Sequence, residues 1–400
     1  MQTFNGTEYL KIDIASQFGL DKEDWDKRID WADSNEDKLE ELVHEAENPA
    51  LFYAAVQAYR KTQRGEPTGH AISLDAASSG LQLLACLTGC EESASLCGVV
   101  STGHREDAYT LIYQAMVNKI QDKAKITRAE CKRAIMTSLY SSQAIPKQVF
   151  GTGELLLTFY QTMEQRAPGA WALNHLLTDL WQPHALSHDW VLPDNFHARI
   201  KVMDKVTKYI QFENVPVAID LNINKGTKEG RSISPNIIHS IDGMVVREMH
   251  RRCTFNRDKI QELLEILTCS KERFGHGLGR EQDTIVKRLW DLYRASGFLS
   301  ARILDYLDIR NLGLVNHEEI KNLILTLPEK PFDIMSIHDC FRVHPNYGNN
   351  LRKQYNIILS DIAKSDLLSF IASQITGHYL PVIKRGDISS KILEADYTLC

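Results

Sequence analysis

The stretch IMSIHDCFRVHP, residues 334–345, combines a strand-like apolar pattern with three ionisable side chains at its centre, His338, Asp339 and Cys340. The pattern on either side predicts a β-hairpin. Burying a carboxylate without a partner is costly, so Asp339 must bind a metal, a cation or a ligand, or else be exposed. A fold that contains this hairpin therefore has to give Asp339 a partner or access to solvent.

Two other interpretations of these residues are open. Strand alternation would place His338 and Cys340 on one face, which would permit a thiol–imidazole pair. Neighbours on one strand face rarely reach the geometry of a nucleophile and its base, and no third group is evident that would orient them. A lone structural aspartate in a turn is the commoner alternative.

Length and composition indicate a soluble globular protein of two or three lobes. The chain has 400 residues, of which 43% are hydrophobic and 24% are charged. No apolar run is long enough for a transmembrane helix, and the first residues lack the pattern of a secretory signal. We therefore expect no membrane partner.

Cysteine spacing and net charge exclude fewer classes of protein than the composition does. The eight cysteines are scattered without a CxxC pair, which favours reduced thiols over a zinc site or a disulfide framework. The net charge of −6 argues mildly against nucleic-acid binding, because phosphate binding depends on Lys and Arg. Overall charge does not report a local basic patch, so this class stays open.

Periodicity along the chain predicts a helix-rich α+β fold with a small antiparallel sheet. A short strand at 71–74 is followed by a helix with leucines on one face, and alternating stretches between 189 and 243 suggest hairpins. Further helices are expected at 21–63, 105–121, 127–140, 170–188, 233–252 and through the charged segment 253–330, with a long one after residue 345.

A second aspartate stands in a similar setting. In AISLDAASSG, Asp75 ends the apolar strand and is followed by small residues that let other groups approach the backbone. Two strand-terminal aspartates far apart in the sequence, Asp75 and Asp339, fit a two-carboxylate site. Such a site can hold two magnesium ions.

A third stretch, TRAECKRAIMTSLYSS at residues 127–142, carries cations on a predicted helix. Arg128 and Lys132 are four residues apart and share one face, and Tyr140 lies two turns further along, toward one flank. Two stacked cations suit a triphosphate, and an aromatic ring suits stacking. The alternative is an amphipathic helix with a solvated basic face.

Together these stretches resemble the single-subunit RNA polymerases of bacteriophages and mitochondria. LDAASSGLQ is similar to that family's motif A, Asp-x-x-x-Ser-Gly-x-Gln; RAECKRAIMTSLY resembles motif B, Arg-x-x-x-Lys-Arg-x-x-Met-Thr-x-x-Tyr; and IHDCF resembles motif C, His-Asp-Ser-Phe. The match departs from the usual residues at Cys340, where serine is usual, and at Ser141, where glycine is usual.

Further segments match in order. REDAYTLIY resembles a segment that would place Tyr109 by the nucleotide, and SPNIIHSIDG one that would place His239 at the ribose. YLKI near the start is similar to a segment whose lysine, here Lys11, lies near the incoming phosphates. The final ILEADYTLC resembles the family's foot, whose terminal carboxylate packs near the active site.

The resemblance implies a right-hand polymerase palm and fingers, with a small antiparallel palm sheet. The expected parts are a first palm segment at 1–105, fingers at 106–232, a segment near the nucleotide ribose at 233–252, a helical insertion at 253–330 and a second palm segment at 331–400. Motif A begins only 75 residues into the chain, so the resemblance further implies that the N-terminal domain and the thumb are absent.

The implied activity is DNA-directed RNA synthesis from ribonucleoside triphosphates on a DNA template. Asp75, Asp339 and the Ala76 carbonyl would hold two magnesium ions, and Asp75, Asp339, Lys132 and Tyr140 would be catalytic. A second polypeptide would supply the missing N-terminal parts, as in a split phage enzyme. The expected location is the cytoplasm of an infected bacterial host.

The remaining residues have implied substrate roles. Arg128 and Lys132 would hold the phosphates, and Lys132 would protonate the departing pyrophosphate. Tyr140 and His239 would favour a nucleotide with a 2′-hydroxyl. Arg133 would face the template, and His338 would orient Asp339 or contact the primer end.

A region at 197–230 resembles the family's promoter-reading hairpin and carries four cations, Arg199, Lys201, Lys205 and Lys208.

Two other functions are alternatives to RNA synthesis. One is a related palm-family DNA polymerase, which the lack of a glutamate steric gate in motif A opposes. The other is a non-catalytic assembly protein that kept the fold, which the intact Asp75, Lys132 and Asp339 oppose.

Overall fold

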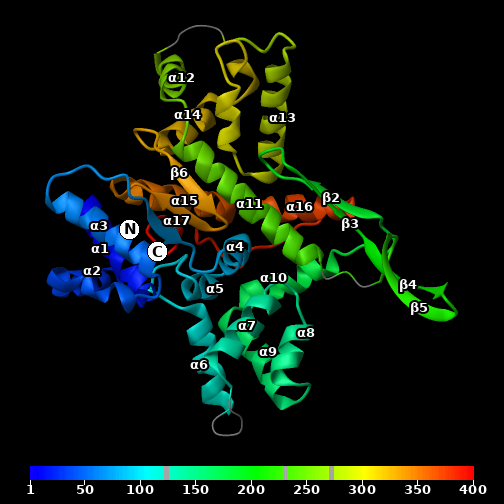
Figure 1. Ribbon diagram of the computed structural model, residues 1–400. Helices are drawn as coiled ribbons and strands as arrows, with labels where there is room; N and C mark the ends of the chain where they lie inside the picture. Colours follow the sequence, from blue (N-terminus) through cyan, green and yellow to red (C-terminus); the bar gives the residue numbers. More distant parts are fainter. Residues whose placement is uncertain (121–125, 229, 231, 270–273) are drawn as a thin grey trace.

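The computed structural model describes residues 1–120, 126–228, 230, 232–269 and 274–400. A three-stranded antiparallel sheet stands at the centre, surrounded by helices, with one helical group above it, another below, and a long hairpin projecting to one side (Figure 1). This is the helix-rich α+β architecture that the sequence predicts. Over the described residues, no helix is both long and apolar enough to cross a membrane.

The central sheet joins distant parts of the chain. Its strands are β1 (Ile72–Asp75), β6 (Ile334–Ile337) and β7 (Cys340–Val343), in the order β1-β7-β6. β6 and β7 form the predicted hairpin, but its two-residue turn is His338–Asp339, because Ile337 pairs with Cys340. The turn begins with a positive φ of 56° at His338, so strand alternation does not apply to these two residues.

Helices from both ends of the chain cover this sheet. The N-terminal group packs against β1 and contains α1 (Gly6–Ala15), α2 (Trp25–Ser34) and α3 (Pro49–Gln63). The remaining central helices are α4 (Ser79–Thr88), α5 (Glu91–Leu96), α11 (Ile233–Cys253), α15 (Gly348–Lys364), α16 (Leu367–Thr376) and α17 (Ser389–Leu393). Short helical turns lie at Ser16–Leu20, Glu36–Lys38, Glu41–His44, Ala301–Asp305, Leu312–Leu314 and Pro345–Tyr347.

A helical lobe hangs below the sheet in Figure 1. It comprises α6 (Ala108–Ile120), α7 (Arg128–Ser138), α8 (Ala144–Phe150), α9 (Glu154–Arg166) and α10 (Pro168–Asp179). α7 begins at a capping box in which Thr127 and Glu130 satisfy each other's backbone N–H groups. The predicted helix at 170–188 is shorter than expected, because the chain enters a strand at Ser187.

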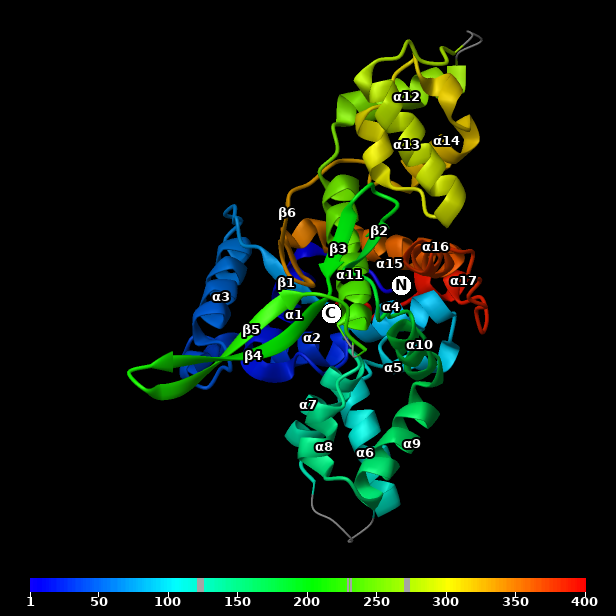
Figure 2. The ribbon, with the colours of Figure 1, turned by 90° about the vertical axis from the view of Figure 1, so that its right-hand side faces the viewer.

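Residues 253–324 contain a second hydrophobic core. It is built by α12 (Arg257–Cys269), α13 (Glu281–Ser296) and α14 (His317–Thr326), with buried residues such as Val286, Leu289 and Ile303. The main core of the molecule is a separate cluster. In Figure 2 these three helices stand together at the top of the molecule, away from the lobe of α6–α10. The segment therefore packs largely on itself.

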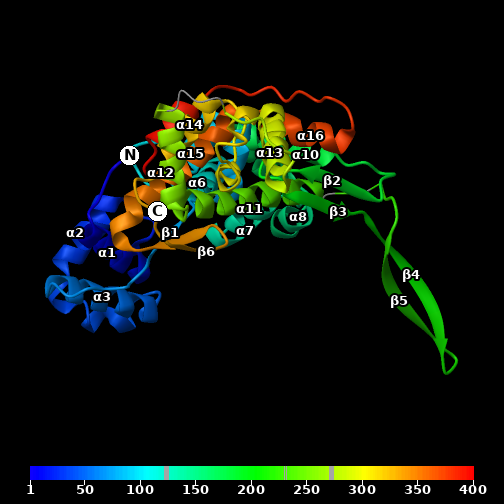
Figure 3. The same cartoon turned by 90° about the horizontal axis from the view of Figure 1, so that it is seen from above.

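Two hairpins occupy the region of alternating residues. β2 (Ser187–Val191) pairs with β3 (His197–Lys201), and β4 (Met203–Phe212) pairs with β5 (Val215–Asn224). The β4–β5 hairpin projects from the body in Figure 3, and every residue of β5 is exposed. The register places aliphatic and aromatic residues on one of its faces: Val206, Ile210, Phe212, Val215, Val217, Ile219, Leu221 and Ile223.

Two of the four cations singled out in this region, Arg199 and Lys205, form ion pairs. Arg199 lies 3.4 Å from a carboxylate oxygen of Asp189, and Lys205 lies 3.0 Å from one of Asp220. Lys208 stands on the apolar face of the hairpin, opposite Ile219.

Seven cysteines have described side chains and all are free thiols, as expected; the side chain of Cys269 lies outside the described residues.

The central sheet should depend on Phe341, which is 1% exposed and packs its ring 6.0 Å from that of Tyr355. Replacing Phe341 with Ala leaves a cavity and should lower the free energy of unfolding by about 3–5 kcal/mol. Met335→Ala on the neighbouring strand is the control, because Met335 is 56% exposed. Urea-induced unfolding followed by tryptophan fluorescence measures both, and equal losses would contradict this assignment.

Candidate active site

The central sheet brings together the two aspartates that the sequence singles out. Asp75 ends β1 and pairs with Cys340, the first residue of β7. Asp339 precedes Cys340 in the hairpin turn, and its main-chain carbonyl accepts a hydrogen bond from the Ala76 N–H at 3.3 Å. Asp75 and Asp339 therefore lie at the same end of the sheet.

The last residues of the chain run along the other edge of β1. The Asp75 N–H donates to the Cys400 main-chain oxygen at 3.2 Å, and the Cys400 N–H donates to the Asp75 carbonyl at 2.9 Å. The Ala77 N–H donates to the Thr398 carbonyl at 3.4 Å. Asp75 is thus fixed from both sides, by β7 and by the final segment.

Like charges gather at this end of the sheet. Partial desolvation and the negative charge of Asp339 raise the pKa of Asp75 to about 6, although the Asp75 side chain still reaches solvent. The positive charge of Arg105 acts in the opposite direction and lowers the pKa of Asp75. The arrangement favours a cation between the two carboxylates.

A third carboxylate, Asp242 of α11, lies nearby. Desolvation and the charge of Asp339 raise the pKa of Asp242 to about 6, while the Ser79 side chain and the positive charge of the nearby His338 lower it. Sequence patterns gave Asp242 no role, although it lies in the quoted segment SPNIIHSIDG. Asp242 lies on α11, and the packing of α11 on α4 brings it near Asp339.

The turn between β1 and α4 is tightly built. Ser78 has a φ of 136°, a conformation that L-residues rarely adopt, and its hydroxyl lies 3.3 Å from the Tyr109 hydroxyl. A Cβ at Gly80 would lie 2.3 Å from the Tyr140 hydroxyl, so only glycine fits there. The small residues that follow Asp75 therefore let Tyr109 and Tyr140 approach this turn.

Tyr140 stands beyond the end of α7 rather than on it, because α7 ends at Ser138. Its ring lies 5.0 Å from the ring of His239 on α11, so these two predicted residues meet. Burial and the neighbouring Asp242 raise the pKa of Tyr140 to about 12, which keeps its phenol protonated. Ser141 next to it has a φ of 65°, which explains why glycine would suit this position.

The two predicted phosphate-binding cations of α7 differ in their surroundings. Arg128 forms an ion pair with Asp107, and its Nε donates to the Thr110 hydroxyl at 2.7 Å. Lys132 is exposed and lies 5.4 Å from the centre of the Tyr109 ring. Lys132 is therefore the cation of this helix that faces the site without an ion pair to a described carboxylate.

Three other predicted residues lie as follows. Lys11 forms an ion pair with Asp33 within the N-terminal group of helices. Arg133 is exposed and contacts Gln148 at 3.4 Å. His338 is exposed at the hairpin turn beside Asp339. Asp33 follows no motif, so the pairing of Lys11 was not visible in the sequence.

The oxygen atoms at this end of the sheet are ligands of the kind that magnesium binds. Asp75 and Asp339 offer hard carboxylate oxygens, and the Ala76 carbonyl lies at the same strand end. Throughout the described chain, no group of three or more His, Cys, Asp or Glu side chains could hold a metal by itself. Magnesium usually binds one or two protein carboxylates plus water and substrate phosphates, so a pair is sufficient.

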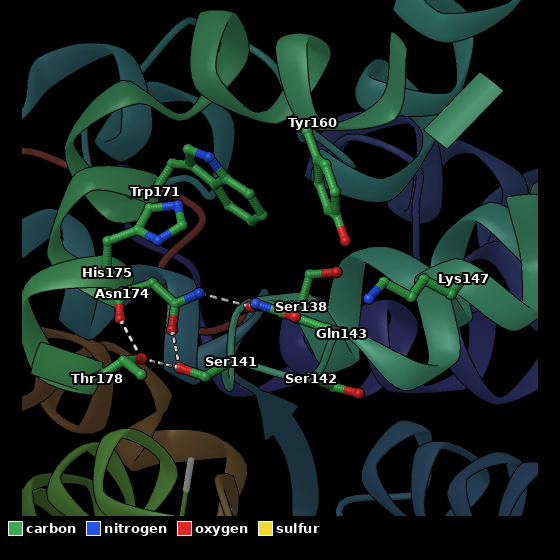
Figure 4. A pocket seen from close by; sticks show the side chains of 10 residues that line it. All are labelled: Ser138, Ser141, Ser142, Gln143, Lys147, Tyr160, Trp171, Asn174, His175 and Thr178. Carbon is green, nitrogen blue, oxygen red and sulfur yellow. Dashed lines mark hydrogen bonds between the residues drawn. The ribbon is translucent and has the colours of Figure 1, made fainter. Parts of the chain in front are cut away.

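A cavity of about 370 Å³ lies in the helical lobe, beside the residues that follow Tyr140 (Figure 4). Its floor is a hydrogen-bonded set in which the Ser141 hydroxyl donates to Asn174 at 2.6 Å and the Asn174 amide donates to the Ser138 carbonyl at 2.7 Å. The rings of Tyr160 and Trp171 lie 5.8 Å apart along its wall. Lys147, Gln143, Ser142, His175 and Thr178 complete the lining.

Comparison with known proteins gives partial matches. The model of a family described as DNA-dependent RNA polymerase matches residues 2–151. A "Probable DNA-directed RNA polymerase" of Neurospora crassa is 27% identical over 158 residues, which cover 34% of this chain and 18% of that protein. A "DNA-directed RNA polymerase, mitochondrial" of Neurospora crassa is 25% identical over 163 residues, 34% of this chain and 12% of that protein.

The matched region spans less than a fifth of the length of these relatives. Both relatives are fungal and one is named mitochondrial, which overturns the expectation of an infected bacterial host's cytoplasm. That expectation rested on the short segment before motif A, which does not identify a source. Residues 2–151 are therefore similar to the DNA-dependent RNA polymerase family, in agreement with the resemblance to the phage and mitochondrial single-subunit enzymes.

Proposed function

We propose that this chain is the catalytic part of a DNA-directed RNA polymerase that adds ribonucleotides to an RNA 3′-hydroxyl on a DNA template. One observation carries the proposal: β1 and β7 pair so that Asp75 and Asp339 meet at one end of the sheet, and Gly80, after the following turn, packs against Tyr140. The family match of residues 2–151 supports the same reaction class.

Asp75 and Asp339 would hold two magnesium ions, together with the Ala76 carbonyl. Bound magnesium supplies Lewis-acid chemistry, lowering the pKa of the attacking hydroxyl and neutralising the triphosphate. The protein's own contribution is to bring two carboxylates together in a rigid sheet, where a bound divalent cation relieves their mutual repulsion. Asp75 is held on both strand edges, which fixes its carboxylate before substrate arrives.

Lys132 is the phosphate-binding residue that the geometry supports best, because it is exposed near Tyr109. It would hold the triphosphate and give a proton to the departing pyrophosphate. The ion pair between Arg128 and Asp107 would fix the start of α7, and Arg128 would reach the phosphates only by leaving that pair. Arg105, near Asp75, is a further cation available to the triphosphate.

Tyr140 and His239 would contact the ribose. Their rings meet at 5.0 Å, and the raised pKa of Tyr140 keeps its hydroxyl as a donor. A site that hydrogen-bonds a 2′-hydroxyl rejects a nucleotide that lacks one, because its polar groups are left unpaired. His338 would orient Asp339 or contact the primer end, and Lys11 would act near the incoming phosphates only by exchanging Asp33 for them.

The cavity beside Ser141 would accept an unstacked base of the template, with Arg133 facing the strand. Aromatic walls suit stacking, and the lysine at the rim suits a phosphate. In this assignment 1–105 and 331–400 form the palm, 106–232 the fingers, and 253–330 a helical insertion with its own core. Residues 233–252 carry His239 to the ribose.

Relatives of this chain are much longer than the region they share with it. The resemblance to a split phage enzyme supports the further proposal that a second polypeptide supplies an N-terminal domain and thumb. A related DNA polymerase is the second candidate function. It is disfavoured because Tyr140 and His239 form the pair that a ribose-selecting site requires.

Primer extension tests the main proposal. Asp75→Asn and Asp339→Asn should each reduce RNA synthesis by at least about 100-fold, because each removes a charge that stabilises the transition state. Ribonucleotides should be preferred over deoxyribonucleotides by the unsubstituted protein. Asp333→Asn is the control, since Asp333 is exposed outside the turn. Preference for deoxyribonucleotides would favour the DNA polymerase instead.

The magnesium requirement should depend on pH. Protons compete with magnesium for Asp75, whose pKa is about 6 without metal. The half-saturating magnesium concentration should stay level above about pH 7 and rise as the pH falls through 6, because the carboxylate is increasingly protonated. Magnesium titrations of primer extension at about pH 5.5, 6.5 and 7.5, which bracket that pKa, measure the effect. A flat dependence would contradict the coupling.

The split arrangement predicts that this chain alone, supplied with duplex DNA, gives no run-off transcript. Co-expression with the products of neighbouring genes, followed by purification of the complex, should restore transcription. Efficient transcription of duplex DNA by the isolated chain would show that no second polypeptide is needed.

A further inference from the structure

The central sheet has one face that helices cover and one face that is open to solvent. The Ser336 hydroxyl of β6 lies 3.0 Å from Nε2 of His250 on α11, and the Phe341 ring of β7 packs on Tyr355 of α15. These contacts place α11 and α15 on one face, and α11 lies beside β6 in Figure 3. Because side chains alternate along a strand, the intervening positions of β6 and β7 point away from these helices.

The open face contains one positively charged side chain. Its six side chains come from all three strands: Ser73, Asp75, Met335, Ile337, Cys340 and Arg342. Met335 is 56% exposed and Ile337 is 58% exposed, so this part of the sheet is accessible to a ligand. Arg342 stands opposite Ser73 on one side and Met335 on the other, on the same face as the Asp75 carboxylate.

Arg342 has no hydrogen-bonding or ion-pair partner among the described residues. Its Nε atom is buried and lacks an acceptor. Two buried arginines of the molecule differ in this respect, because Arg252 pairs with Asp361 and Arg352 pairs with Asp396. A guanidinium keeps its charge and offers five N–H donors in a plane, which suits the paired oxygens of a phosphate. The structure thus leaves the donors of Arg342 available for a ligand.

The position of Arg342 along the sheet indicates which phosphate it can reach. Lys132 and Tyr140 lie toward the turn that follows Asp75, beyond the end of β1. Arg342 lies on the other side of Asp75, two residues after Cys340, which is about 7 Å along the strand. The proposed triphosphate subsite and Arg342 are therefore on opposite sides of the carboxylate pair.

The RNA strand whose 3′-hydroxyl reacts leads away from the incoming triphosphate. Its last phosphodiesters are therefore the phosphates that lie nearest to Arg342. Met335 and Ile337 flank this cation with exposed apolar surface, which suits the carbon atoms of a ribose better than a phosphate. A cation beside an apolar strip matches a sugar–phosphate backbone laid across the face.

We propose that Arg342 binds a phosphodiester of the RNA strand close to its reacting 3′ end, with Met335 and Ile337 against the neighbouring ribose. The contact would hold the 3′ end at the carboxylate pair of Asp75 and Asp339. The identity of the strand rests on the proposed function. The presence of a phosphate-binding residue on the open face is measurable without catalysis.

Fluorescence anisotropy of a labelled RNA–DNA hybrid, titrated with the full chain, tests the contact. Arg342→Gln should weaken binding by about 10–100-fold, because charge-assisted hydrogen bonds to the phosphate are lost. The plot of log Kd against log salt concentration should become shallower by about 1, as expected when one phosphate contact is removed. Arg342→Lys keeps the charge but not the planar donors, so it should keep the slope and lose only part of the affinity.

Neutral linkages in the RNA strand locate the phosphate. A single methylphosphonate is placed in turn at each of the last few linkages, with the adjacent 2′-hydroxyl omitted, and a phosphodiester strand with the same omission is the reference. The unsubstituted protein should lose affinity by about 10-fold or more at one linkage. Arg342→Gln should lose less than about twofold there, because the partner of that phosphate is already absent.

Arg294→Gln is the matched control, since Arg294 is exposed on α13, in the segment that has its own core. It removes the same charge from the chain and should change neither the affinity nor the salt dependence. Circular dichroism should show that all three variants fold. In primer extension, Arg342→Gln should raise KM for the hybrid and leave KM for the ribonucleotide within about twofold, because the triphosphate lies on the other side of the carboxylates.

The results separate this inference from the proposed function. An unchanged salt dependence in Arg342→Gln overturns the contact, and so does a methylphosphonate effect that persists in that variant. Failure of the unsubstituted protein to bind the hybrid overturns it as well. If binding depends on Arg342 at one linkage but the unsubstituted chain adds no ribonucleotide, the proposed function fails and the contact stands.

Discussion

The antiparallel pairing of β1 with β7 is the interaction on which the site depends. Four residues of each strand, 72–75 and 340–343, join parts of the chain that are far apart in sequence. The pairing sets the register, and a shift of one residue would turn every side chain of β1 to the opposite face. Asp75 and Asp339 are neighbours only in the observed register, and the final segment closes the other edge of β1.

The helices around this sheet supply the remaining side chains of the candidate site. α11 carries His239 and Asp242, α6 carries Tyr109, α7 carries Lys132, and Tyr140 follows the end of α7. These side chains meet at the turn before α4, where small residues leave room for them. The site is therefore formed by long-range packing around a short sheet, and its polar groups constrain one another through shared contacts.

Much of this could be predicted from the sequence, because local patterns set the strands and most helices. Alternation placed the hairpin at 334–345, and Asp75 was visible as a carboxylate at a strand end. The turn at His338–Asp339 was not, since a positive φ at a histidine leaves no sequence signal. The ion pairs of Arg128 with Asp107 and of Lys11 with Asp33, and the approach of Asp242 to Asp339, arise from tertiary packing that periodicity cannot report.

The β4–β5 hairpin has a consequence for handling the protein. Its apolar face, with Phe212 66% exposed and Val215 61% exposed, is a surface of the kind that promotes association. The net charge of −6 opposes association only over the screening length of the buffer, about 8 Å at physiological ionic strength. Salt concentrations high enough to strip bound nucleic acid would remove that repulsion and strengthen apolar contacts. High salt concentrations therefore favour the removal of nucleic acid from this protein, whereas low salt concentrations favour its solubility.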